Sequence, residues 1–193
     1  MSWAGPVQIE IGKTKYKDTP AFSPSMTPQV QEDLPSLVCF SHLRWNFVYQ
    51  RPQHLMSRFA RDYRVFFVEE PLDAESQTAW LDVRTEEGGV RVVVPRLPGR
   101  RTPEQTADTL RTLLDGFFQA EGIVDPVLWY YTPMSLDFTD HLRGGVTVYD
   151  CMDELSAFKG APPQLIERER TLLSKADLVF TGGYSLWEAK RSL

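Results

Sequence analysis

Residues 37–71 have the sequence LVCFSHLRWNFVYQRPQHLMSRFARDYRVFFVEEP. The apolar run Leu37–Phe40 is typical of a buried strand, and Pro52 is suited to the first turn of the amphipathic helix that follows it. A second apolar run, Arg64–Val68, ends before Pro71, which cannot donate to a strand ladder. A buried strand on each side of an amphipathic helix predicts a parallel β-α-β unit.

The same alternation of strands and helices continues along the chain. Thr102 and Pro103 begin the clearest helix, because a hydroxyl N-cap and a proline at N1 are followed by Gln105 at N3. Its apolar face is expected to pack into the core through Leu110, Leu113, Leu114, Phe117 and Phe118. Further strands are expected at Trp80–Arg84, Val90–Val94, Val127–Tyr131, Val146–Tyr149 and Leu178–Thr181, the first two as a hairpin. These elements predict an α/β fold, with a Rossmann-like, mostly parallel sheet covered by helices on both faces.

The first 36 residues differ in composition from the rest of the chain. They are rich in Pro, Ser, Thr and Lys and have little hydrophobic periodicity, so residues 1–36 are predicted to be a flexible leader and residues 37–193 a single domain. No segment has the pattern of a signal peptide or of a membrane-spanning helix. We therefore expect a cytoplasmic protein, with peripheral association at the inner face of the membrane as an alternative.

Charge, cysteines and one loop exclude several classes of function. The net charge of −5 argues against a broad nucleic-acid surface. Cys39 and Cys151 lie in apolar runs without the spacing of a zinc site, and a chain of this size needs no disulfide framework. The loop Ser41–Pro52 contains no glycine, which argues against an NAD, FAD or ATP site. Glu69 and Glu70 are therefore interpreted as solvated acids at a strand end, and no cofactor or metal is predicted.

The candidate site is expected beyond the carboxyl ends of the strands, where open parallel sheets bind their ligands. His42 is suited to contact a hydroxyl, and a histidine bonded to backbone is the alternative. Trp45 could stack on a sugar or cap the sheet edge, and Arg51 could bind an anionic group or anchor the loop. Asp150 and Asp153 could orient or deprotonate an acceptor hydroxyl, or serve only in backbone bonding and helix capping.

Three segments resemble the N-terminal domain of bacterial glycosyltransferases of the GT-B type. They are FSHLRWNFVYQRPQHLMSRFA (residues 40–60), VYDCMDELSAFKGAP (residues 148–162) and ADLVFTGGYSLWEAK (residues 176–190). The family that they resemble includes members in the synthesis of teichuronic acid and other cell-surface polysaccharides. Similar segments occur in proteins fused or linked to UDP-galactopyranose mutase. The resemblance covers approximately residues 37–193.

The resemblance implies transfer of a sugar from a nucleotide-sugar donor to a saccharide or lipid-linked acceptor, between two Rossmann-like domains. In such enzymes the C-terminal domain usually supplies the positive charge that the departing diphosphate needs. The chain is therefore interpreted as the acceptor-side half, with the donor domain absent and with no transfer by this half alone. His42, Asp150 and Asp153 are the catalytic candidates, and Trp45 and Arg51 the substrate-binding ones. A non-catalytic carbohydrate- or partner-binding module is the alternative, whereas the glycine-free first loop disfavours a nucleotide-dependent oxidoreductase.

Overall fold

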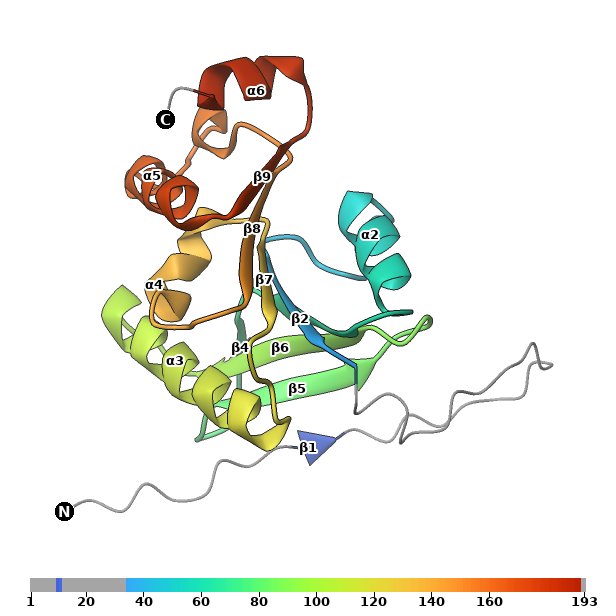
Figure 1. The fold of residues 1–193 in the computed structure, drawn as a ribbon. Coiled ribbons are helices and arrows are strands. Elements are labelled where there is room, and N and C mark those ends of the chain that lie inside the picture. The colour runs from blue at the N-terminus through green and yellow to red at the C-terminus, as the bar shows by residue number, and fades with distance from the viewer. Residues whose placement is uncertain (1–9, 12–33, 192–193) are drawn as a thin grey trace.

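The structure is a computed structural model that describes residues 10–11 and 34–191. Figure 1 shows a sheet with helices on both of its faces. The strands are β1 (Glu10–Ile11), β2 (Ser36–Ser41), β3 (Arg64–Glu69), β4 (Leu72–Ala74), β5 (Trp80–Thr85), β6 (Arg91–Pro98), β7 (Val127–Tyr130), β8 (Val146–Cys151) and β9 (Leu178–Thr181). The helices are α2 (Arg51–Phe59), α3 (Pro103–Ala120), α4 (Leu136–Thr139), α5 (Leu165–Lys175) and α6 (Tyr184–Lys190), with short 3-10 turns η1 (Pro133–Ser135) and η2 (Leu155–Ala157).

All the described strands belong to one sheet. Their order is β1-β5-β6-β3-β2-β7-β8-β9, and β4 pairs with β6 beside this path. The strand pairs are parallel except β5 with β6, which form the expected antiparallel hairpin. The carboxyl ends of β2, β3, β7, β8 and β9 therefore lie along one edge, as the sequence predicted. The prediction of a Rossmann-like, mostly parallel α/β fold is confirmed.

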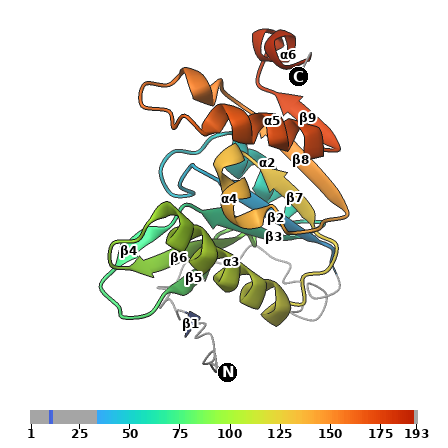
Figure 2. The ribbon, with the colours of Figure 1, turned by 90° about the vertical axis from the view of Figure 1, so that its left-hand side faces the viewer.

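Two hydrophobic clusters pack on opposite faces of the sheet. Helices α3, α4 and α5 cover one face, which Figure 2 shows toward the viewer, and α2 covers the other. On the first face, Leu114 and Phe117 of α3 are fully buried, and the Phe117 ring meets Phe66 of β3 edge to face. On the second face, Met56 of α2 packs into a cluster that includes Trp129 of β7. Burial of these apolar faces is the main source of the stability of the fold.

The N-terminus of α3 forms as its sequence predicts. The Thr102 hydroxyl accepts a hydrogen bond from the backbone N–H of Gln105 at 3.3 Å, and the Gln105 side chain accepts one from the N–H of Thr102 at 3.0 Å. This reciprocal pair satisfies two of the donors that a helix N-terminus leaves free. The helix therefore begins at Pro103, and its first turn lines a pocket together with Ser41 and Glu69 at the carboxyl edge of the sheet.

The structure changes some of the predicted boundaries. Ser36 pairs with Arg64 within the sheet, so the domain begins one residue earlier than expected. Of the predicted leader, residues 1–9 and 12–33 lie outside the described residues, whereas Glu10–Ile11 pair with β5. Strand β8 extends through Asp150 to Cys151, because both residues pair with β9.

Short elements and one exposed edge also depart from the sequence pattern. Strand β4 and helix α4 were not predicted, because three or four residues carry too little periodicity to be recognised. The apolar side chains of β9 are 40–51% exposed, since this strand is the last in the sheet order. Within the described ranges, no helix is both long and apolar enough to cross a membrane.

Candidate functional site

The site lies where the sheet order changes direction. From β2 the chain continues to β3 on one side, and it later returns to place β7 on the other side of β2. The loops after β2 and β7 therefore diverge above the sheet and leave a crevice between them. Ligands of open α/β sheets bind at such a switch point. At this position Ser41 ends β2 and His42 follows it, and Tyr131 and Thr132 follow β7.

The loop after β2 is held in place by Glu69 at the end of β3. Glu69 accepts a hydrogen bond from the Trp45 N–H at 2.8 Å and one from Arg44 Nη1 at 3.0 Å. Arg44 also donates to the Glu70 carbonyl at 2.7 Å. The Glu69 side chain is only 3% exposed. The interpretation of Glu69 as a solvated acid is therefore wrong. Its buried carboxylate instead anchors the loop after β2, which contains no glycine.

Trp45 belongs to the core. Its side chain is buried, and its ring packs edge to face on Phe67 with the centroids 5.1 Å apart. The Trp45 carbonyl accepts a hydrogen bond from the buried Gln53 side chain at 2.7 Å, which ties the loop to α2. A ring enclosed in this way has no free face, so the prediction that Trp45 stacks on a sugar is replaced by a packing role.

Arg51 and Asp150 form an ion pair between α2 and β8. Arg51 Nε donates to Asp150 Oδ2 at 2.9 Å, and the Asp150 side chain has no exposed surface whereas that of Arg51 is 40% exposed. Burial raises the pKa of Asp150, and the hydrogen bond and positive charge of Arg51 oppose the rise. Oδ2 of the fully buried Asp150 carboxylate therefore holds Arg51 in this conformation, and a catalytic role for Asp150 stays a prediction.

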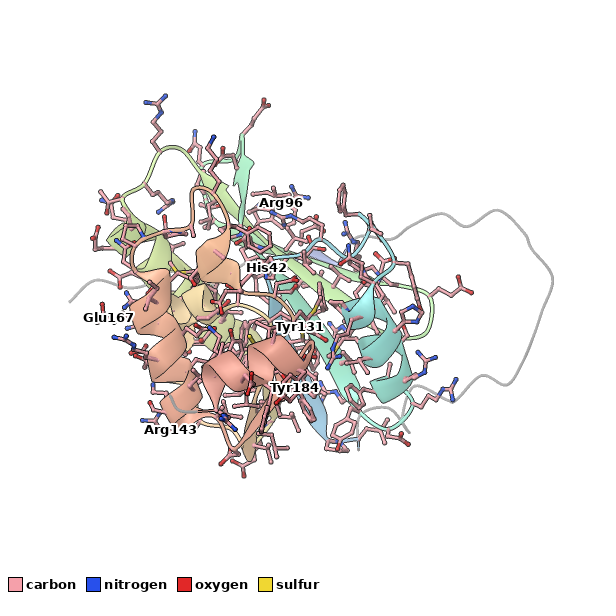
Figure 3. The ribbon with its side chains drawn as sticks, turned by 90° about the horizontal axis from the view of Figure 1, so that it is seen from above. His42, Arg96, Tyr131, Arg143, Glu167 and Tyr184 are labelled. Carbon is pink, nitrogen blue, oxygen red and sulfur yellow. The ribbon has the colours of Figure 1, made fainter. Side chains whose placement is uncertain are left out.

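His42 and Tyr131 face the same region from the two sides of the crevice. Figure 3 looks onto the molecule from above and shows both near the middle of the view. His42 Nδ1 is a buried atom without a hydrogen-bond partner among the described residues, and the Tyr131 hydroxyl and the Asp150 carboxylate lie close enough to act on each other's pKa. Burial lowers the pKa of His42, whereas the charge of Asp153 and a hydrogen bond with the Tyr131 backbone raise it. Buried polar atoms are nearly always paired, so His42 Nδ1 is suited to accept a hydrogen bond from a water molecule or a ligand.

The pKa of His42 can be measured directly. We expect NMR titration of its imidazole protons to give a pKa below the ordinary value of about 6.5. Asp153→Asn should lower this pKa further, because the variant removes a negative charge that favours the imidazolium. Asp108→Asn, which changes an exposed acid on α3, is the matched control. An unchanged pKa in Asp153→Asn would place Asp153 too far away to act on His42.

A pocket of about 470 Å³ opens at the same edge of the sheet, lined by Ser41 of β2 and Thr132 after β7 among others. Its polar lining comes from strand ends and from the segment after β7, and includes Ser41, Glu69, Glu70, Thr106, Thr132, Ser135 and Asp137. Apolar surface is contributed by Val68, Leu110, Met134 and Phe138. A second hollow of about 600 Å³ adjoins it and shares Pro71, Arg101 and Thr106. Most of the lining surface of the 470 Å³ pocket is apolar, with hydroxyl and carboxylate groups placed among it that can hydrogen-bond a small molecule such as a saccharide.

The structure separates Trp45, which lies in the core, from the other four predicted site residues. Arg51 and Asp150 are in contact, the charge of Asp153 acts on His42, and Tyr131 acts on the pKa of both His42 and Asp150, so these four predicted residues lie in one region. None of the five lines the 470 Å³ pocket, although His42 directly follows Ser41, which does. Sequence reasoning missed the pocket hydroxyls, of which Ser41 and Thr132 directly follow the apolar runs 37–40 and 127–131, whereas Thr106 and Ser135 carry no such signal. The described residues also contain no group of three His, Cys, Asp or Glu side chains placed to hold a metal ion.

Comparisons with known proteins give distant likenesses of structure, of which two are described here. No family model matches the chain, and no curated protein matches it. A trehalose-6-phosphate structure from E. coli bound with UDP-2-fluoro glucose shares 10% sequence identity at a TM-score of 0.44, covering 75% of this chain and 39% of its own. An α,α-trehalose-phosphate synthase (UDP-forming) from Burkholderia xenovorans, in complex with glucose-6-phosphate, shares 14% identity at a TM-score of 0.39.

The two likenesses cover only part of those proteins. The chain spans 39% and 40% of the length of the two solved structures, while 75% of this chain is covered in each. At these TM-scores the likeness assigns no role to any residue. The site therefore rests on its own geometry.

Proposed function

We propose that this chain is the acceptor-side domain of a two-domain glycosyltransferase of the GT-B type. Its substrate would be a saccharide or lipid-linked acceptor in the synthesis of a cell-surface polysaccharide, at the cytoplasmic face of the membrane. The observation that carries the proposal is the pocket at the sheet switch point, whose mostly apolar lining includes hydroxyls and carboxylates and which opens at the same sheet edge as the buried, unpaired Nδ1 of His42. The resemblance of three sequence segments to that family supports it.

His42 has the properties of a general base for this reaction. Its lowered pKa keeps the imidazole neutral near pH 7, so that it can accept a proton. In the proposed step the acceptor hydroxyl oxygen bonds to the anomeric carbon of the donor, the bond from that carbon to the diphosphate breaks, and the hydroxyl proton passes to His42. Asp153 would then stabilise the imidazolium through its negative charge. Arg51, fixed by Asp150, is a positioning residue for the loop that carries His42.

The donor would be bound by a second domain. The leaving diphosphate requires preorganised positive groups, and the cationic side chain that lines the 470 Å³ pocket is Arg101. Of the pocket carboxylates, Glu69 and Asp137 are paired with Arg44 and Arg168, and Glu70 forms no ion pair within the described ranges. Arg101 is already committed, since it donates to the Pro98 carbonyl and to Thr109 at 3.1 Å each. The described part of the chain is therefore poorly suited to bind a nucleotide diphosphate, and we propose that it does not transfer sugar without the second domain.

The proposal is tested by measuring binding to the purified chain. We expect glucose, galactose or N-acetylglucosamine, or disaccharides of these sugars, to shift NMR signals of residues around the pocket, and Glu70→Ala to weaken that binding about tenfold, or about 1.4 kcal/mol. Glu70 is chosen because it lines the pocket and its side chain makes no hydrogen bond within the described ranges. Glu87→Ala changes an exposed acid in the β5–β6 turn and should leave the affinity unchanged.

Calorimetry with UDP and UDP-glucose tests whether the chain has only the acceptor side of the site or a complete site that also binds the donor. We expect no measurable binding of either nucleotide by this chain. Micromolar affinity for UDP-glucose, or sugar transfer above background, would require a donor site within it and would contradict the proposal. Saccharide binding without transfer, even when the chain is joined to a donor-binding domain, would favour the alternative of a non-catalytic carbohydrate-binding module.

A further inference from the structure

The segment after β9 contacts both sequence neighbours of Asp153, which lies in the segment after β8. On one side, Gly182 packs directly against Met152, because a Cβ at position 182 would overlap the Met152 carbonyl oxygen. Glycine is the residue that permits such a close approach of two backbones. On the other side, Lys190 of α6 donates to the Glu154 carboxylate at 2.8 Å. The backbone on each side of Asp153 is therefore in contact with the segment after β9.

Hydrogen bonds within the segment after β8 connect Glu154 to Asp153. The Asp153 carbonyl accepts from the Leu155 N–H at 3.0 Å and from the Cys151 thiol at 3.6 Å. The Glu154 carboxylate also accepts from the Ser156 hydroxyl at 2.7 Å, so it is bonded inside the segment as well as to α6. A displacement of Glu154 would therefore move Asp153 with it.

The bond from Lys190 to Glu154 is not needed to neutralise a buried charge. Lys190 also donates to Glu169 of α5 at 2.7 Å, and the side chains of both residues are buried. Glu154 is more exposed than Glu169, and its hydrogen bond to Lys190 lowers its pKa, so it is ionised at neutral pH. Since Glu169 already balances the lysine, the second bond serves to tie the segment after β8 to α6.

Asp153 depends on this backbone for its position. Its side chain is exposed, and its carboxylate forms no ion pair within the described ranges. The charge of Asp153 raises the pKa of His42, as does a hydrogen bond with the Tyr131 backbone. The other charged groups of this region, Arg51 and Asp150, are paired with each other. Asp153 is therefore the free charge that acts on His42.

We propose that Lys190 is a positioning residue of the candidate site, which holds Asp153 beside His42 through its bond to Glu154. The inference deepens the proposed function and rests on it, because the place of Asp153 matters to transfer only where His42 accepts the acceptor proton. It gives residues 176–190, the third segment of the family resemblance, a part in the site although none of them lines the 470 Å³ pocket.

NMR titration of His42 tests the proposal on the free chain. Glu154→Ala removes the acceptor of the Lys190 bond and leaves Glu169 to pair the cation, so the fold should persist. We expect this variant to lower the His42 pKa, because a released Asp153 favours the imidazolium less. Glu154→Gln should leave the His42 pKa close to that of the unchanged chain, because its amide oxygen can still accept from Lys190.

Glu167→Ala is the matched control for the loss of an acid. Glu167 is an exposed residue of α5, and Figure 3 shows it well away from His42. Its replacement should not change the His42 pKa. A shift equal to that of Glu154→Ala would mean that net charge, and not the bond to Lys190, acts on His42.

A double variant separates position from charge. If Lys190 acts through Asp153, adding Glu154→Ala to Asp153→Asn should cause no further shift of the His42 pKa. Equal shifts with and without Asp153 would show that Glu154 acts by its own charge, and that result overturns the proposal. An unchanged His42 pKa in Glu154→Ala, or in Asp153→Asn, overturns it as well. The titration uses no substrate, so failure of the proposed function would appear separately, in the saccharide-binding experiment.

Discussion

Replacing Lys190 with methionine is expected to destabilise the domain by about 3–5 kcal/mol, because it leaves a buried carboxylate without its cation. Lys190 of α6 donates to Glu169 of α5 at 2.7 Å and to Glu154 at 2.8 Å, and its side chain is only 7% exposed. The Glu169 side chain is 9% exposed, and its other oxygen accepts from the Tyr149 hydroxyl at 2.8 Å. Burial lowers the pKa of Lys190, but its bonds to both carboxylates raise it overall.

The measurement is urea unfolding at pH 7, followed by circular dichroism, with Lys159→Met as control. Lys159 is exposed and forms no ion pair within the described part of the chain, so its replacement should change the free energy of unfolding by less than about 0.5 kcal/mol. Adding Glu169→Gln to Lys190→Met should recover part of the loss, because the amide removes the unpaired charge. A loss below about 1 kcal/mol in Lys190→Met would show that α6 separates from α5 without unfolding the sheet, which amide exchange in α6 would detect.

This network shows one limit of reasoning from sequence. Glu169 occupies the buried face of α5 together with Leu165 and Leu172, at positions i, i+4 and i+7. A carboxylate in an apolar stripe indicates a buried partner, but the partner is 21 residues away in another helix. Local periodicity could have located the buried acid. It could not identify Lys190, because that pairing depends on how α5 and α6 pack.

The sheet itself was predictable because its signals are local. Apolar runs of four to six residues separated by capped helices specify parallel strands, and the Thr102 cap and the β5–β6 turn were both readable in the chain. The exposure of β9 was not predictable, because its apolar run has the same pattern as that of a central strand. Its exposure follows from its place at the end of the strand order, which is a property of the whole sheet.

The site was predictable as a region and not as a set of contacts. Parallel strands bring the residues after β2 and β8 to one edge, so His42 and Asp153 could be expected near each other. The orientation of Trp45 into the core depends on Glu69 and Phe67, which come from a different strand. The pocket itself requires the first turn of α3 and the segment around Asp137 to meet the sheet edge. Such long-range packing cannot be recognised from the sequence of any single segment.

The ion pair between Arg51 and Asp150 is expected to couple stability to pH. Arg51→Leu should destabilise the domain by on the order of 2 kcal/mol at pH 7, less than a fully buried pair because Arg51 is 40% exposed. The loss arises because Asp150 keeps its buried charge without the guanidinium that balances it. The pKa of Asp150, already raised by burial, should then rise further, since Arg51 opposes that rise in the unchanged chain.

The direction of the pH dependence follows from this raised pKa. A carboxyl whose pKa is higher in the folded than in the unfolded state favours folding when it is protonated, and this contribution is lost as pH rises through the folded pKa. The difference in unfolding free energy between Arg51→Leu and the unchanged chain should therefore be greatest at pH 7 and shrink toward pH 4. In Arg51→Leu with Asp150→Asn, the pH dependence of this difference should disappear and most of the stability should return. A pH-independent loss in Arg51→Leu, unaffected by Asp150→Asn, would mean that Arg51 stabilises the start of α2 by packing and not through its charge.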